Sequence, residues 1–134
     1  MLSTKNRLTN ERFYDAFILF DDMLAQKYNI EEEGVKKYME KMKECYTEAR
    51  DLIPEWDDTF KRLTHIRNRF ISLKDGKVAF EHFQGKDEDV VWMQVFQEKL
   101  DAQADVLSKY AKIDFAKKNN NKGLLGKLLK MFKG

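Results

Sequence analysis

Apolar residues recur every three or four positions through most of the chain, which is the period of helices that bury one face. The pattern predicts four helices: the first from about residue 6 or 10 to residue 28, and the others over about 31–52, 56–73 and 87–116. Asn29 ends the first range. Pro54 stops the second and opens the third, because proline lacks the backbone N–H that a helix interior needs. With short connections between them, these helices favour an up-down four-helix bundle.

The longest connection lies between the third and fourth predicted helices. Residues 78–83 follow a turn signal and are too short for a helix of their own, so they form either a packed extended connection or a small strand. Asp87 suits the N-cap of the fourth helix. The length of this connection makes it a place for a site.

The end of the chain differs in composition. Residues 117–123 read as a flexible linker, and residues 124–134 place leucines and a phenylalanine on one side, flanked by lysines. We therefore divide the chain into a helical domain over 1–116, the linker, and a basic amphipathic tail. Three fates stay open for the tail: packing on the bundle or a second protomer, docking on a protein partner, or lying on an anionic membrane or nucleic acid.

Composition agrees with an all-α class and narrows the functions. Charged residues make up 36% of the 134 residues, with one proline and six glycines. The net charge of +2 divides into +6 over the last twenty residues and −4 over the rest, which excludes a globally basic nucleic-acid binder. The sequence has no P-loop, dinucleotide fingerprint or Cys/His cluster, so we expect no cofactor and no metal. The single Cys45, with no signal peptide or membrane span visible, fits a cytoplasmic protein.

The third predicted helix carries a charge where the pattern predicts burial. In helical projection, Arg67 falls inside an apolar stripe made of Trp56, Phe60, Leu63, Phe70 and Ile71. A guanidinium on a buried stripe is costly unless a carboxylate pairs with it or water reaches it. Two readings stay open. One is a structural pair with Asp15, Asp21 or Asp22 of the first helix, and the other is a site that opens at the stripe.

The residues around Arg67 resemble a known superfamily. The segment 56–63, the sequence Ile66-Arg67-Asn68 and the acidic helix start at Glu88-Asp89 resemble small bacterial proteins of the HEPN superfamily (higher eukaryotes and prokaryotes nucleotide-binding). The resemblance covers about residues 10–110. It implies a four-helix domain whose active members cleave RNA without a metal. Their motif is an arginine, a polar residue and, a few positions later, a histidine, often paired across a dimer.

Carried onto this chain, the resemblance implies that Arg67 stabilises the charge of the phosphorane and that Asn68 is the orienting polar residue. Ser72 stands where the histidine is expected, and a hydroxyl does not titrate near neutral pH, so the motif is degenerate. His65 lies on the same helix but points away from Arg67. His82 is the remaining candidate base, either folded back over the end of the helix or supplied by a partner protomer.

The leading prediction is a degenerate, non-catalytic HEPN-like protein that binds RNA or a protein partner. The resemblance implies a toxin–antitoxin or phage-defence setting, and we expect a homodimer. One alternative is an active, metal-independent endoribonuclease that uses Arg67, Asn68 and His82. Another is a small interaction or inhibitor protein that acts through its tail or an acidic helix face. Peripheral membrane contact through the tail is a further option.

Overall fold

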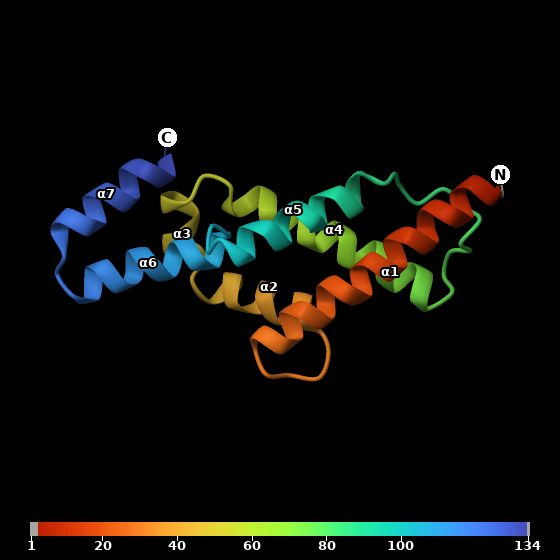
Figure 1. Cartoon of the computed structure of the whole chain (residues 1–134), viewed down its shortest axis with the longest axis horizontal. Helices are drawn as coiled ribbons and strands as arrows, with labels where there is room; N and C mark the ends of the chain where they lie inside the picture. Colours follow the sequence, from red (N-terminus) through yellow and green to blue (C-terminus); the bar gives the residue numbers. More distant parts are fainter. Residues whose placement is uncertain (1–2, 134) are drawn as a thin grey trace.

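In the computed structural model, which describes residues 3–133, all regular secondary structure is helical. The helices are α1 (Thr4–Lys27), α2 (Gly34–Glu44), α3 (Tyr46–Leu52), α4 (Trp56–Lys74), α5 (Glu88–Asp101), α6 (Val106–Lys118) and α7 (Lys122–Lys133). The all-α class is thus confirmed, and residues 78–83 form no strand. Within the described chain, no helix has the length and apolar composition needed to cross a membrane. The molecule is elongated, with the start of α1 at one end and the α6–α7 turn at the other (Figure 1).

Helix α1 supplies one wall of the core. Its most deeply buried apolar side chains, none more than 3% exposed, are Phe13, Phe17, Phe20, Leu24 and Ala25. The helix packs against α2, α4 and α5. The ring of Phe17 stacks on Phe70 of α4 with centroids 4.3 Å apart, and Phe20 meets Phe96 of α5 edge to face at 5.6 Å. These aromatic contacts tie the three helices into one core.

Helix α2 begins directly against α1. Gly34 is buried, and a Cβ at this position would lie 2.2 Å from the backbone nitrogen of Ala25, so no larger residue fits. Asp21 of α1 holds the start of α2 in place. Its carboxylate accepts hydrogen bonds from the backbone N–H of Glu33 at 3.1 Å and of Val35 at 2.9 Å. The contact satisfies backbone donors that the first turn of a helix leaves free.

The predicted helix over 31–52 is wrong in extent. It begins only at Gly34 and is divided at Cys45, whose φ of −114° and ψ of 17° depart from helical backbone. The apolar period continues across this residue, which is why the sequence pattern predicts a single helix.

The predicted helix over 87–116 is also broken, at residues 102–105. Gln103 has a φ of 54°, in the left-handed region. The buried carboxylate of Asp105 accepts from the Tyr38 hydroxyl at 2.6 Å and from the backbone N–H of Ser108 at 3.3 Å. Asp105 is therefore the N-cap of α6, and a side chain from α2 fixes its position. Asp87 occupies the N-cap position of α5 but makes no side-chain capping bond.

Helix α7 folds back on its own chain. Helix α6 runs to Lys118 and α7 starts at Lys122, so a turn at 119–121 replaces most of the linker predicted over 117–123. Helix α7 contacts α6 and α3, and Leu128 is only 7% exposed. Leu124, Leu125, Leu129 and Phe132 are half-buried against the same core, whereas Met131 is 61% exposed. The tail therefore packs on its own chain through most of its apolar face.

Candidate functional site

Helix α4 buries an arginine among apolar side chains. Its buried residues are Trp56, Thr59, Leu63, Ile66, Arg69 and Leu73. The buried face is thus rotated from the predicted stripe, since Phe60, Phe70 and Ile71 are only half-buried. The arginine in the core is Arg69, and Arg67 lies at the edge of the buried face. The pattern missed this rotation because two of the six buried positions, Thr59 and Arg69, are polar and so weaken the apolar signal of that face.

Arg69 is 4% exposed and is held by groups from α1 and α5. Its Nη1 donates to Asp89 of α5 at 2.9 Å, and its Nη2 donates to the Asn10 side-chain oxygen of α1 at 2.9 Å. The guanidinium carbon lies 3.9 Å from the ring centroid of Phe13. Burial lowers the pKa of Arg69, and the carboxylate of Asp89 opposes this shift.

Asp89 gathers three basic side chains of α4. Besides Arg69, it accepts from Arg62 Nη1 at 2.8 Å, and its Oδ2 lies 3.0 Å from His65 Nε2. Asp89 is 1% exposed, whereas the His65 side chain is 52% exposed. The arrangement fixes α4 against α5, because a buried carboxylate needs several donors to offset its lost hydration.

The network also orders the connection 75–87. The Asn10 side-chain amide donates to the carbonyl oxygens of Phe80 at 2.7 Å and of His82 at 2.8 Å. A Cβ at Gly85 would lie 3.2 Å from Arg69 Nη1. The long connection therefore packs on the Arg69 network as an irregular segment.

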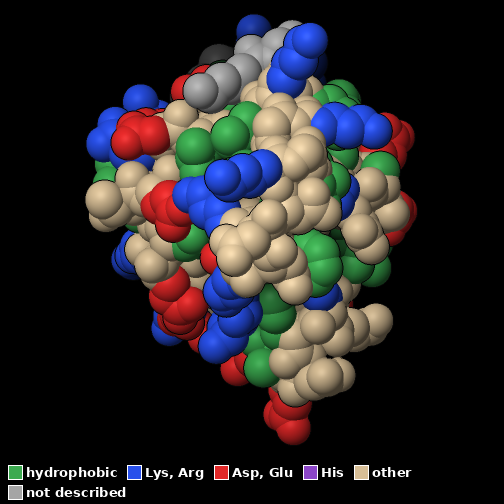
Figure 2. Space-filling model, turned by 90° about the vertical axis from the view of Figure 1, so that its left-hand side faces the viewer, with side chains coloured by type: hydrophobic (Ala, Val, Ile, Leu, Met, Phe, Trp, Pro, Cys, Tyr) green, Lys and Arg blue, Asp and Glu red, His purple; other side chains and the backbone are tan. Residues whose placement is uncertain are grey.

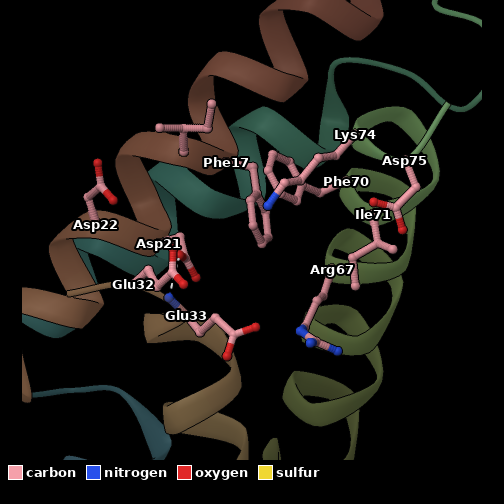
Figure 3. Close-up of a pocket in the computed structure, with 11 residues that line it drawn as sticks. Phe17, Asp21, Asp22, Glu32, Glu33, Arg67, Phe70, Ile71, Lys74 and Asp75 are labelled. Atoms are coloured by element: carbon pink, nitrogen blue, oxygen red, sulfur yellow. Dashed lines mark hydrogen bonds between the residues drawn. The ribbon is translucent and has the colours of Figure 1, made fainter. Parts of the chain in front are cut away.

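Arg67 points into a cleft of about 360 Å³, on the side of α4 opposite to the Arg69 network (Figure 3). It is half-buried and makes no hydrogen bond or ion pair with any residue in the described range 3–133. The structural pairing with Asp15, Asp21 or Asp22, one of the two readings of the sequence, is therefore wrong. Asp21 is already committed to the backbone of α2.

The walls of this cleft carry opposite charges. Helix α4 contributes Arg67 and Lys74, whereas Asp22, Glu32 and Glu33 come from the end of α1 and the loop before α2. Figure 3 shows Glu33 pointing across the cleft toward Arg67. The apolar part of the lining includes Phe17, Ile18, Phe70 and Ile71. With Asp21 and Asp75, the acidic side chains of the lining outnumber its basic ones.

The structure does not gather the other predicted site residues around Arg67 within one chain. Asn68 is exposed, and neither it nor His82 lines the Arg67 cleft. His82 is exposed in the connection beside α1, where its backbone carbonyl binds Asn10. The backbone carbonyl of Ser72 accepts from Lys77 and Val78 at the end of α4. A role for His82 across a dimer stays a prediction.

The sequence pattern did not identify three residues of the buried network as site residues: Asn10, Arg69 and Asp89. Each shares a helical face with buried apolar residues, as Asn10 does with Phe13 and Phe17. That spacing is the signal that could have found them, because a polar residue on a buried face needs a polar partner. No group of three His, Cys, Asp or Glu residues in the described chain could hold a metal ion.

Comparison with protein families places the chain in a family. Residues 11–125 match the model of DUF6548, a family of unknown function. No curated protein and no solved structure matches the chain.

Proposed function

The chain belongs to DUF6548, a family of unknown function, and we propose from its own residues that it is a non-catalytic binding protein whose Arg67 cleft receives a segment of a protein partner. We further propose that its helices form an HEPN-like four-helix bundle, as the resemblance around Arg67-Asn68 implies. The toxin–antitoxin or phage-defence setting belongs to the same proposal and rests on that resemblance alone.

The observation that carries the proposal is the unpaired guanidinium of Arg67 in a preformed cleft. Arg69, two residues away, has its charge matched by Asp89. Arg67 has no such match among residues 3–133, although four acidic side chains of the neighbouring segments line the same cleft. A half-buried donor of this kind is available to an incoming carboxylate, with which arginine forms strong bidentate bonds.

The charge pattern of the cleft favours a protein segment over nucleic acid. Asp22, Glu32 and Glu33 would repel a phosphate backbone brought to Arg67. A peptide can satisfy both walls, with an acidic side chain on Arg67, basic side chains on Glu32 and Glu33, and an apolar side chain over Phe17 and Phe70. The fitting partner is thus an amphipathic segment of mixed charge.

The non-catalytic part of the proposal rests on the missing base. Ser72 cannot act as a general base near neutral pH, and within one chain His82 lies outside the Arg67 cleft. A ribonuclease of this kind needs an arginine and a proton-transferring group at the same phosphate. Arg67 thus supports binding better than it supports cleavage.

The binding test uses labelled peptides that carry one glutamate, several lysines and one aromatic residue, with fluorescence anisotropy as the measurement. We expect Arg67→Ala to weaken the best peptide about tenfold, which corresponds to about 1.4 kcal/mol. Lys61→Ala removes an exposed charge from the same helix outside the cleft and should leave the affinity unchanged. Arg67→Glu should bind the peptide in which the glutamate is replaced by arginine. Equal binding by wild type and Arg67→Ala would contradict the proposal.

A separate assay tests the absence of catalysis. Wild-type protein is incubated with labelled single-stranded and structured RNA in EDTA, beside Arg67→Ala. We expect both to leave the RNA intact. Cleavage by wild type that the variant lacks would instead establish the metal-independent ribonuclease, whatever the peptides show.

A further inference from the structure

The α6–α7 hairpin forms a basic end of the molecule. No Asp or Glu follows Asp114, and the last twenty residues carry +6. Figure 2 faces this end and shows Lys and Arg side chains across its middle, with acidic side chains mainly toward its edges. Lys122, Lys127 and Lys130 are exposed on α7 and make no ion pair with any residue from 3 to 133. Their charges are therefore available to an anionic partner.

An exposed aromatic side chain stands among the lysines of α6. Phe115 is 60% exposed, and Lys112 and Lys118 lie three residues before and after it, on the same face of the helix. Lys118 pairs with Asp114 at the surface, and the Lys112 Nζ donates to the carbonyl of Gln103 at 2.9 Å. An apolar ring at this position gains nothing from the core, but a base can stack on it while phosphates reach the lysines.

Two glycines lie between the lysines on the outward face of α7. Gly123 and Gly126 are exposed, and a Cβ at Gly126 would meet no atom within 4 Å. Packing therefore does not require glycine at position 126, although glycine costs about 1 kcal/mol relative to alanine within a helix. Glycines between the lysines let an extended ligand approach the helix backbone closely.

From the lysines and Phe115 together, we propose that the α6–α7 hairpin binds single-stranded nucleic acid. Lysines of α7 contact the phosphates, and a base stacks on Phe115. Insertion into a membrane fits less well, because Leu128 is only 7% exposed and Leu124, Leu125, Leu129 and Phe132 pack against the core, which leaves Met131 as the one largely exposed apolar side chain described on α7. A duplex offers no free base to Phe115. This surface is separate from the Arg67 cleft, which lies between α1 and α4, and the proposal does not depend on the partner that binds there.

The test measures the affinity of the full chain for a fluorescein-labelled oligouridylate over a range of salt concentrations. The triple variant Lys122→Gln/Lys127→Gln/Lys130→Gln should bind at least about tenfold more weakly near physiological salt. For this variant, the slope of log K against log salt concentration should be shallower by about 2. Each lost phosphate contact removes about 0.7 from the slope for a single strand, and three contacts are lost. Phe115→Ala should weaken binding about fivefold or more, and Phe115→Tyr should keep it.

Matched controls separate this site from general charge and exposure. Lys5→Gln/Lys77→Gln/Lys86→Gln removes three exposed lysines elsewhere, and Phe83→Ala removes a ring that is 66% exposed in the connection after α4. Both controls should bind like wild type. The proposal is overturned if wild type does not bind the oligonucleotide, if the controls lose as much affinity as the hairpin variants, or if polyglutamate or anionic phosphatidylglycerol vesicles bind at least as tightly.

Discussion

Two arginines on one helix, Arg67 and Arg69, lie in opposite surroundings. They are two residues apart and so point in directions about 160° apart around α4, because each residue advances roughly 100°. Arg69 meets the buried carboxylate of Asp89 and the amide of Asn10, whereas Arg67 meets a cleft. The difference lies in the neighbouring helices, since the two side chains are chemically identical.

At the residue scale, we expect the loss of Asp89 to lower the stability of the protein more than the loss of any other member of the buried network. We expect Asp89→Ala to lower the free energy of unfolding by about 3–5 kcal/mol, because it leaves Arg69 buried without its carboxylate. Urea unfolding followed by circular dichroism measures the change. The double variant Asp89→Leu/Arg69→Met should be less destabilised than Asp89→Ala, since no uncompensated charge remains in the core.

Asp87 provides the control for this prediction. It is on the same segment and pairs with Arg12, but both side chains are more than half exposed. Water screens such a pair, so Asp87→Ala should change stability far less than Asp89→Ala. Similar losses from the two variants would show that the network around Asp89 does not hold α4 against α5.

At the element scale, both helix breaks depend on contacts with other parts of the fold. Tyr38 and Asp105 are 67 residues apart in sequence, yet their hydrogen bond sets where α6 begins. The segment between α5 and α6 has no glycine or proline to mark it. The apolar period runs on through the break, so the helical pattern gives no warning of it.

A glycine at position 103 tests this break, because the substitution should stabilise the protein if the helix is broken there and destabilise it if the helix is continuous. At a φ of 54°, Gln103→Gly should stabilise the protein by about 0.5–1 kcal/mol, because glycine adopts left-handed backbone without the cost that other residues meet there. In an unbroken helix the same change would destabilise by about 1 kcal/mol. Gln94→Gly, at an exposed position inside α5, is the matched control and should show that loss. Thermal unfolding measures both variants.

At the scale of the whole molecule, one buried and two half-buried tyrosines couple the fold to alkaline pH. Burial is the main cause that raises the pKa of Tyr38 well above its usual value near 10, and Asp105 adds to the shift. Burial also raises the pKa of Tyr28 and of Tyr110 to about 12, with contributions from Asp105 and Glu48 respectively. The three rings lie on or after different helices, so their shifts belong to the assembled fold.

The sign of the pH effect follows from these directions. Each folded-state pKa lies above that of the unfolded chain, so the unfolded chain loses its tyrosine protons first as pH rises. We expect constant tyrosine-dependent stability below about pH 10 and falling stability from about pH 10 toward 12. Tyr38→Phe should make this fall shallower, whereas Tyr46→Phe, which alters a ring that is 43% exposed, should not. Urea unfolding at a series of pH values measures the slope, and an unchanged slope in Tyr38→Phe would contradict the burial argument.

The local pattern determined the helical class and the extent of α4, because both depend on residue spacing along one helix. Helix α4 is predicted over 56–73 and is found at Trp56–Lys74. It also identified Arg67 as an unusual charge. Contacts between distant residues decided which face of α4 is buried, where the helices break, and that the tail packs back. Spacing along a helix says which residues share a face. The partner that compensates a buried charge, as Asp89 does for Arg69, comes from another helix, and its position exists only once the helices have packed.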